Sequence, residues 1–464
     1  MKIADKEYLL TIDEKAEKLK RSILEDISTP AYTGKAFYVS ASGDDANDGL
    51  SPETPVASLN RITTLPLEEG DAVLFKRGDL FRGNVIVPRD GITFAAYGEG
   101  KKPRISASPE NAASPYRWEK SEWENIWHYK VRLDNLDIGH MLFDGRNGNK
   151  KILRHHGFSG KPEDLAGDLE FFQDQPEGAL YVFSAEGNPG ERFCDIEMFP
   201  RVPGFAVGKH NNTHIDNLCI MHVGVHGVSA GTLDGLRVTN CEIGYIGGSI
   251  QYVKGDAPAT RFGNGVEIYG SCRDFLVDRC YIHDVYDAGV THQRKGKGDI
   301  PFLMENVTYS NNLFEHCIYS IEYFCDQENS DEDMMRHIRM TNNICRFAGG
   351  FGWQRPNKVA RHIQGGWLNC KRKYPAEDYV VEGNIFDRSI DTLLSVSSVR
   401  KEHLPVMKGN TYIQYAGKNF GINDVPYDHY EPFDDKIEDY IRNYRNEPDA
   451  EIYVVPEYDG KCDY

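Results

Sequence analysis

The sequence predicts an all-β protein folded as a parallel β-helix, a coil of short strands in which each turn stacks on the one before it. Three observations predict this fold class. After residue 35 the chain consists of short runs of alternating apolar residues separated by turn residues. Gly makes up 44 of the 464 residues, which is more than the usual ~7%. After residue 205 an internal repeat sets the spacing of the strands.

Seven segments after residue 205 share alternating apolar residues, then Asn or Cys, then another apolar pair. The shared positions are Cys219, Cys241, Cys280, Asn312, Asn343, Asn384 and Asn410, spaced by 22, 39, 32, 31, 41 and 26 residues. A minimum spacing near 22 residues, with a variable number of additional residues, fits three short strands per turn joined by loops of variable length. Inward Asn side chains at one corner are expected to form an amide ladder. A β-propeller would need a stricter period of ~40 to 45 residues, and a sandwich would not stack identical corners.

We predict five regions along the chain. They are an N-terminal helix and cap (1–34), the first rungs (35–107), an inserted β-rich subdomain (108–205), the main β-helix (206–415) and an acidic Tyr-rich tail (416–464). In the first region, apolar residues recur at helical spacing over 5–27, which we interpret as a capping helix that forms a lid over an open end of a sheet. The tail is expected to pack along the coil, where it could also cover an edge or support a homo-oligomer.

The composition restricts the partners and the location. A net charge of -18 argues against nucleic acid and against an anionic membrane surface. No apolar run approaches the 18 residues of a transmembrane helix. The ten cysteines form no C-x-x-C pair, and the start MKIADKEYLL lacks the apolar stretch of a secretory signal. We therefore expect a reduced, cytoplasmic protein.

Several stretches resemble a known group of proteins. YVSASGDDANDGLSPETPVASLNRI and LPLEEGDAVLFKRGDLFRG resemble the opening rung of right-handed parallel β-helix proteins of the pectate-lyase-like superfamily. RFGNGVEIYG, YIHDVYDAGVTHQ, YSIEYF and GGFGWQRPN resemble β-helix glycoside hydrolases of the fucosidase/xylanase group, and GALYVFSAEGNPGE is similar to an insertion in that group. The resemblance covers roughly residues 35 to 415. It implies a right-handed coil and suggests hydrolysis of O-glycosyl bonds, although the superfamily also contains lyases, epimerases and non-enzymes.

Strand alternation places three acids near one another. Glu267, Thr291 and Glu322 are expected to point outward in one vertical row, and Asp287 is expected in the turn leading into the middle strand. Rungs lie about 4.8 Å apart, so Glu267 and Glu322 should be roughly 9 to 10 Å apart at the backbone. Glycoside hydrolysis needs one protonated and one ionised carboxyl, ~5 to 5.5 Å or ~6.5 to 9.5 Å apart. The alternative is three solvated surface acids, and a one-residue slip would turn each side chain to the other face.

Other polar and aromatic residues in the same stretches are candidates for binding substrate. They are His226, His292, Gln293, Trp353, Gln354, Arg355 and Arg261. A Trp ring can stack on the apolar face of a sugar, and His226 should lie one rung below Glu267. The arginines could bind sugar hydroxyls or a carboxylate, or pair with the excess acids of the chain. We predict no metal site and no cofactor, with Ca²⁺ held by Asp287 and Glu322 as the alternative.

These residues predict a glycoside hydrolase that acts exo-wise on plant- or host-glycan-derived oligosaccharides. A cytoplasmic enzyme would meet imported oligosaccharides rather than polymers. A polysaccharide lyase or uronate epimerase is the first alternative, and it would need a basic group where the candidate row is acidic. A non-catalytic carbohydrate-binding β-helix is the second alternative.

Overall fold

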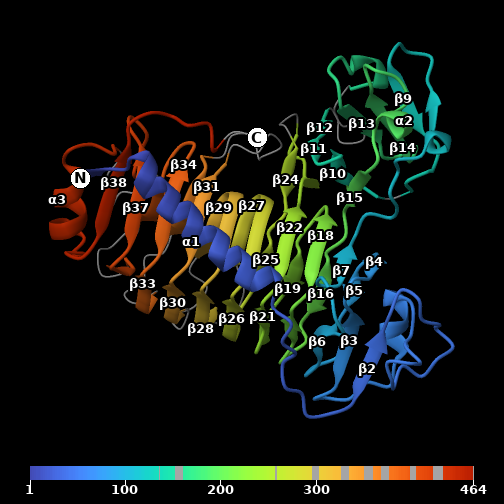
Figure 1. The fold of residues 1–464 in the computed structure, drawn as a ribbon, viewed down its shortest axis with the longest axis horizontal. Helices are drawn as coiled ribbons and strands as arrows, with labels where there is room; N and C mark the ends of the chain where they lie inside the picture. Colours follow the sequence, from blue (N-terminus) through green and yellow to red (C-terminus); the bar gives the residue numbers. More distant parts are fainter. Residues whose placement is uncertain are drawn as a thin grey trace.

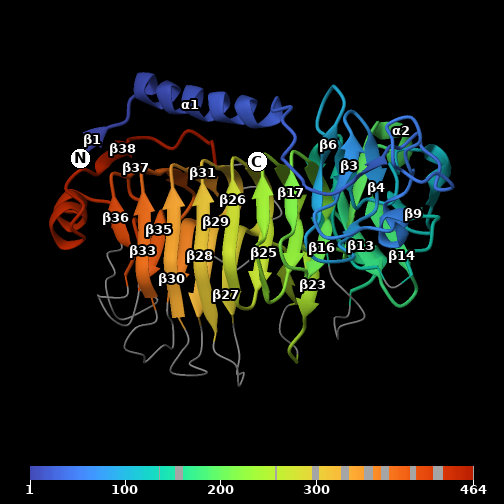
Figure 2. The ribbon, with the colours of Figure 1, turned by 90° about the horizontal axis from the view of Figure 1, so that it is seen from below.

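The computed structural model describes residues 1–134, 136–151, 160–255, 259–294, 302–325, 334–349, 359–366, 376–397, 404–421 and 432–462. The chain forms a parallel β-helix whose rungs stack along the long axis of the molecule (Figures 1 and 2). A rung passes through three faces, which we name the rear, helix and cavity faces. Inward side chains from all three form one apolar core through the coil. The predicted all-β fold with an N-terminal helix is confirmed.

The rear face is a parallel sheet that runs the length of the coil. Its strands are β2 (Ala36–Val39), β3 (Ala72–Lys76), β6 (Thr93–Tyr97), β17 (His214–Asp216), β21 (Arg237–Thr239), β26 (Cys272–Asp278), β28 (Leu303–Ser310), β30 (Met334–Thr341), β33 (Ala376–Glu382) and β36 (Val406–Lys408), with β20 (Leu233–Asp234) paired to β26.

The helix and cavity faces belong to one sheet, because β27 (Tyr281–Arg294) and β29 (Leu313–Cys325) run through the corner between them. The helix face also contains β4 (Leu80–Arg82), β7 (Arg104–Ser106), β18 (Cys219–Val223), β22 (Glu242–Ile246), β31 (Ile344–Ala348), β34 (Ile385–Ser389), β37 (Thr411–Tyr415), β38 (Glu451–Val455) and β1 (Lys2–Ile3). The cavity face also contains β5 (Val85–Ile86), β16 (Phe205–Gly208), β19 (Val228–Ala230), β25 (Val266–Tyr269), β32 (Arg361–Gly366) and β35 (Leu394–Ser397).

A ladder of buried amides runs along the corner between the rear and helix faces. From Asn312 to Asn343, Asn384 and Asn410, each Asn donates from its backbone N–H and its Nδ2 to the Oδ1 of the next, at 2.9 to 3.0 Å. Each Nδ2 also donates to a carbonyl of the preceding rung at 2.9 Å. Glu447 ends the ladder by accepting two bonds from Asn410 at 2.8 Å. The predicted ladder is confirmed.

The register corrects one position of the predicted repeat. Cys219 pairs with Glu242, so Leu218 and not Cys219 occupies the corner position that Cys241 has in the next rung. The error arose because Leu218 and Cys219 are both apolar and adjacent, so the pattern fits either residue. In the later rungs the polar Asn marks the corner without ambiguity, and Cys280 begins the ladder by donating its backbone N–H to Asn312.

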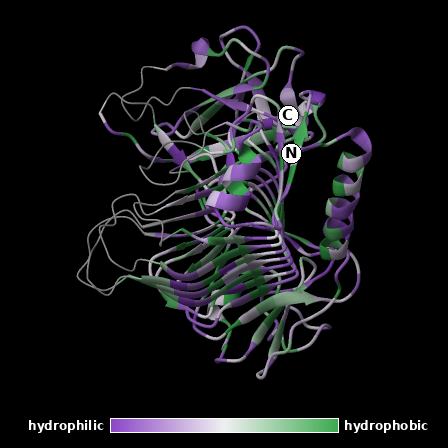
Figure 3. Ribbon diagram, turned by 90° about the vertical axis from the view of Figure 1, so that its left-hand side faces the viewer, coloured by the Kyte–Doolittle hydropathy of each residue, from purple (hydrophilic) through white to green (hydrophobic). Residues whose placement is uncertain are grey.

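Helix α1 (Lys6–Leu24) lies along the helix face across several rungs (Figures 1 and 3). Its N-cap is Asp5, whose side chain accepts the backbone N–H of Tyr8 at 2.9 Å. Its buried residues Ile12, Ala16 and Ile23 pack on outward apolar side chains of β27, β29, β31, β37 and β38. The prediction of a lid over an open end is therefore wrong, because the apolar stripe of α1 covers a lateral face. Among the described helices, none is long and apolar enough to cross a membrane.

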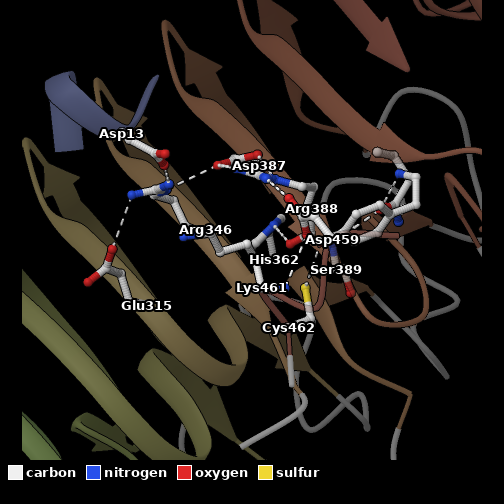
Figure 4. A network of polar contacts seen from close by, with 12 residues as sticks. Asp13, Glu315, Arg346, His362, Asp387, Arg388, Ser389, Asp459, Lys461 and Cys462 are labelled. Atoms are coloured by element: carbon white, nitrogen blue, oxygen red, sulfur yellow. Dashed lines mark hydrogen bonds and ion pairs between the residues drawn. The ribbon is translucent and has the colours of Figure 1, made fainter. Parts of the chain in front are cut away.

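A network of buried charges fixes α1 and the C-terminal segment to the helix face (Figure 4). The guanidinium of Arg346 contacts Asp13 of α1, Glu315 at 3.3 Å and Asp387 at 3.0 Å. Arg388 pairs with Asp387 at 2.7 Å and with Asp459 in the C-terminal segment. Burial alone would raise the pKa of Asp387, but the charges of Arg388 and Arg346 outweigh burial and hold that pKa below its usual value.

A second polar cluster lies on the helix face at β27. The Nδ1 of His283 lies 2.6 Å from Asp284, and its Nε2 lies 3.7 Å from Glu242. Burial alone would lower the pKa of His283, but hydrogen bonds and charges from these two acids raise it to about 9. The folded protein therefore carries a buried imidazolium at neutral pH.

The C-terminal region adds a rung instead of lying beside the coil. Strand β38 pairs with β37 in parallel, and β1 then pairs with β38 at the end of the sheet. The short helix α3 (Ile437–Asp439) and the π-helical turn Tyr440–Tyr444 precede this strand, at the far end of the coil in Figure 1. The alternating apolar residues Ile452 and Val454 in EIYVV explain the strand, and the tail prediction overlooked them.

The inserted segment between β7 and β16 forms two small sheets with their own apolar core. One sheet contains β8 (Trp118–Lys120), β9 (Ile126–Tyr129), β12 (Asn149–Lys150), β13 (Glu170–Asp174) and β14 (Ala179–Phe183); the other contains β10 (Ile138–Phe143), β11 (Arg146–Asn147) and β15 (Ile196–Pro200). Helix α2 (Pro189–Arg192) lies just before β15. The insertion leaves the coil at the corner between the helix and cavity faces, because β7 belongs to one face and β16 to the other (Figure 1).

The ladder leads to a prediction about stability. Asn343→Ala removes the acceptor of two Asn312 donors and the donor to the Tyr309 carbonyl. Because these groups stay buried, we expect a loss of roughly 2 to 4 kcal/mol in the free energy of unfolding. Urea titration followed by circular dichroism measures it. The exposed Asn60→Ala is the matched control, with an expected change within about 0.5 kcal/mol; equal values for the two variants would contradict a supporting role for the ladder.

The pKa of His283 predicts how stability depends on pH. Because the folded pKa of about 9 lies above the unfolded value of about 6.5, the stabilisation is complete below pH 6.5 and is lost as pH rises through 9. The expected loss is on the order of 3 kcal/mol across this window. His283→Gln should flatten this slope in urea titrations at pH 6.5, 7.5 and 8.5. The partly exposed His128→Gln should leave it unchanged, and a slope that survives in His283→Gln would contradict the assignment.

Candidate active site

A cavity of about 780 Å³ lies on the cavity face, between the sheet and the antiparallel hairpin β23 (Ser249–Tyr252) and β24 (Thr260–Phe262). Its floor comes from the cavity-face strands and its wall from the hairpin. Its lining residues are Ala206, Gly208, His226, Ser229, Ala230, Gly231, Gln251, Tyr252, Phe262, Asn264, Glu267, Tyr269, Asp287, Gln293 and Glu322. All three predicted catalytic acids therefore meet at one cavity.

The predicted vertical row is confirmed by the strand register. Glu267 of β25 pairs with Thr291 of β27, which pairs with Glu322 of β29, so the two glutamates lie two rungs apart. Both are about nine-tenths buried, at 9% and 8% exposure, and Thr291 between them is fully buried. The row continues toward the N-terminal rungs through Ser229 and Ala206, whose small side chains leave space above the floor.

Asp287 lies at the corner between the helix and cavity faces, inside β27 and not in a turn before it. The pairing of β27 with β29 shifts register between Val285 and Ala288, so Asp287 occupies an irregular position of the strand. Its backbone N–H donates to the Gly263 carbonyl at 3.1 Å. A bulge of this kind directs a side chain away from the regular row, and here Asp287 lines the same cavity as Glu267.

The hairpin leaves and re-enters the coil at a close crossing of two glycines. A Cβ on Gly263 would lie 2.1 Å from the Cα of Gly247, and both residues have positive φ. Only glycine allows this approach together with this backbone conformation. The crossing places Tyr252, which is 54% exposed, and Phe262 over the floor of the cavity.

The inserted subdomain holds the hairpin in place. Asp137 accepts the backbone N–H of Ile250 in β23 at 2.6 Å and pairs with Lys150 at 2.5 Å. Burial lowers the pKa of Lys150 to about 8, although Asp137 acts in the opposite direction. Arg261, a predicted substrate-binding residue, donates to the carbonyls of Gly248 at 2.5 Å and Gly139 at 2.7 Å. The structure thus places Arg261 between the hairpin and the subdomain, outside the residues that line the cavity.

Glu267 accepts hydrogen bonds from three neutral side chains. The Nε2 of His226 lies 3.2 Å from its Oε1, and the Nδ2 of Asn264 lies 2.6 Å from its Oε2. The Nε2 of Gln293 reaches the same Oε2 at 3.4 Å. The backbone N–H of Asn264 donates to the Nδ1 of His226 at 3.0 Å, so the ring proton is on Nε2 and points at Glu267. Three donors directed at one carboxyl suit an ionised carboxylate.

Gln293 connects the two glutamates of the row. Its Nε2 also donates to the Oε2 of Glu322, at 3.3 Å. One nitrogen contacts both Oε2 atoms, at 3.4 and 3.3 Å. The two oxygens therefore cannot be farther apart than the sum of these two distances. The side chains thus come much closer than the roughly 9 to 10 Å expected for their backbones two rungs apart. This upper limit includes the ~5 to 5.5 Å separation that retaining glycosidases use.

His292 does not reach the cavity. It pairs with Ile268 and Tyr323 on the inward side of the sheet and is fully buried. Its two ring nitrogens contact the hydroxyls of Tyr309 at 2.9 Å and Tyr379 at 3.2 Å. Burial lowers the pKa of His292 to about 3. Because side chains alternate along a strand, His292 points to the opposite face from Thr291. The prediction that His292 binds substrate did not take this alternation into account.

The remaining predicted binding residues Trp353, Gln354 and Arg355 lie outside the described residues. Among the residues that the structure does describe, no group of three His, Cys, Asp or Glu side chains is arranged to hold a metal ion. The sequence reasoning missed Asn264, Tyr252 and Phe262. The Gly-Asn-Gly run before Glu267 was the available signal for Asn264, because such a run marks a tight backbone approach.

Comparisons with known proteins give limited likenesses. No family model matches the chain. It is 31% identical over 118 residues to the lacto-N-biosidase of Bifidobacterium longum subsp. longum, which is 23% of this chain and 7% of that protein, so the chain spans a small part of this relative. The complex of XylC with xylose aligns at 13% identity and a TM-score of 0.47 over 83% of this chain and 67% of that chain. The GH136 lacto-N-biosidase from Eubacterium ramulus aligns at 13% identity and a TM-score of 0.36 over 97% and 70%.

Proposed function

We propose that the protein is a glycoside hydrolase that acts on oligosaccharides at the cavity described above. The observation that carries the proposal is the convergence of Glu267, Asp287 and Glu322, from three successive rungs, on one cavity. Hydrolysis of a glycosidic bond needs a carboxylic acid and a carboxylate on either side of the bond. The short sequence match with a lacto-N-biosidase supports the same class of reaction.

The contacts distinguish the roles of the acids. Glu267 accepts bonds from three neutral donors, so we assign it the ionised role, as nucleophile or as the base that activates water. Glu322 shares the Gln293 contact, at 3.3 Å, and we assign it the remaining role, the general acid that protonates the leaving oxygen. Asp287 at the bulge lines the same cavity.

The hydrolase reading is favoured over a lyase or epimerase by the groups present. Proton abstraction next to a carboxylate requires a free base, usually Lys, Arg or His. Among the described lining residues the only basic side chain is His226, and its two nitrogens already contact Asn264 and Glu267. A binding protein without catalysis is the second alternative, and the variants below separate it from an enzyme. A cytoplasmic location stays a prediction.

Removing either assigned carboxyl should abolish turnover. Glu267→Gln and Glu322→Gln keep the size of each side chain, so we expect kcat to fall roughly 10³-fold while the unfolding midpoint stays near that of the wild type. Release of aryl alcohol from a panel of aryl glycosides measures the loss. The control is Glu53→Gln, an exposed acid in an N-terminal loop, which should retain full activity.

The products test the alternatives. Hydrolysis yields reducing ends without near-ultraviolet absorption, whereas a lyase yields an unsaturated sugar that absorbs there. Full activity in both glutamate variants would contradict the assigned site. Binding of oligosaccharide by the wild type without any product would identify a binding protein.

We also propose that the enzyme acts from one chain end. The hairpin stands over the floor on one side of the cavity and is fixed by Asp137, which favours a pocket that accepts a terminal sugar. With an oligosaccharide labelled at its reducing end, exo action should release one small product of constant size from the first minutes. Chromatography of early time points measures it. A mixture of intermediate lengths at low conversion would indicate endo action instead.

A further inference from the structure

Asn264 uses all of its polar groups in contacts that join three successive rungs. Its backbone N–H donates to His226, and its carbonyl accepts the backbone N–H of Gly227 at 2.9 Å, both on the rung below. Its Oδ1 accepts the backbone N–H of Ala288 at 2.9 Å on the rung above. Its Nδ2 donates to Glu267 on its own rung at 2.6 Å. Asn264 is 3% exposed and lines the cavity.

The partners fix the orientation of the Asn264 amide. A backbone N–H can only donate, so the side-chain atom facing Ala288 must be the oxygen. The NH₂ group must then face Glu267. By the same argument the Nδ1 of His226 must accept from the backbone of Asn264, so the proton of that ring faces Glu267 as well. One residue therefore sets two of the three donors directed at the Glu267 carboxylate.

The backbone around Asn264 leaves little freedom to adopt another arrangement. A Cβ on Gly265 would lie 2.3 Å from the Gly289 carbonyl oxygen, and Gly263 makes the crossing with Gly247 described above. The Gly-Asn-Gly segment thus touches backbone on both sides. The contacts of Asn264 are held by this packing before any substrate arrives, as a catalytic carboxylate requires.

We infer that Asn264 is a positioning residue that holds Glu267 by hydrogen bonds and aims it at the substrate, both through its own amide and through the tautomer it imposes on His226. This inference rests on the proposed hydrolase function. Asn264 itself does not need to touch the substrate, because its effect passes through Glu267 and His226.

The variant Asn264→Asp tests the inference with almost no change of shape. Its carboxyl would keep the contact with Ala288 but place an oxygen where the Nδ2 now meets Glu267. Two carboxyls this close share one proton, and they retain it to a higher pH than a single carboxyl would. We expect kcat/KM to fall roughly 10²-fold at pH 5 and to recover as pH rises. The acidic limb of its pH profile should move upward by about one unit or more.

Controls separate positioning from a general loss of structure. Asn306→Asp is matched, because Asn306 also donates its Nδ2 to a carboxylate, Asp274, at 2.9 Å, but on the exposed rear face. It should leave the pH profile unchanged. Asn264→Ala, which adds no charge, should lose activity with a smaller displacement of the limb than Asn264→Asp. If Asn264→Asp lowers activity equally at every pH, the inference is overturned.

A measurement that needs no turnover separates failure of this inference from failure of the proposed function. The nitrogen NMR shifts of His226, assigned by comparison with His226→Gln, report which ring nitrogen carries the proton. The inference expects the proton on Nε2 in the wild type. A proton on Nδ1 would overturn it even if the protein is a hydrolase. An Nε2 proton in a protein that cleaves no glycoside would support the geometry and refute the function.

Discussion

The register between successive rungs is the constraint on which the site depends. Glu267 and Glu322 are far apart in the chain and become neighbours only because β25, β27 and β29 stack without a slip. A shift by one residue would exchange Glu322 with Tyr323, which now faces the core. The start of the Asn ladder opposes such a shift between β27 and β29, because Asn312 accepts the backbone N–H of Cys280 and donates to the Val277 carbonyl, and a displaced amide would leave these buried groups without partners.

The buried charges on the helix face have different partners from the buried carboxylate Glu267 in the cavity. Arg346 and Arg388 are surrounded by acids, so that the positive and negative charges compensate each other and bind α1 and the C-terminal segment to the coil (Figure 4). In the cavity, Glu267 is surrounded by neutral donors. Neutral donors satisfy the hydrogen bonds of a carboxylate without cancelling its charge. This difference is what makes the first cluster suited to stability and the second suited to chemistry.

The wall of the cavity is one departure of the chain from the coil, and a second departure at the same corner supports it. The inserted subdomain leaves between β7 and β16, and the hairpin leaves between β22 and β25. Asp137 and Arg261 join the subdomain and the hairpin by hydrogen bonds to backbone groups. Each of the two elements forms its own sheet. The repeating coil supplies a rigid floor, while the departures at its corners shape the space above it.

The sequence by itself determined the β-helix, the Asn ladder and the outward row of Glu267, Thr291 and Glu322, because these follow from the period-two alternation of strands and a repeated corner residue. It did not determine which neighbours surround the row. Asn264, Tyr252 and Arg261 acquired their places only where the hairpin and the insertion fold against the coil. The position of α1 was missed for the same reason, whereas strand alternation alone already turns His292 away from the row. A local pattern states which face a residue occupies, whereas the packing of distant segments decides what covers that face.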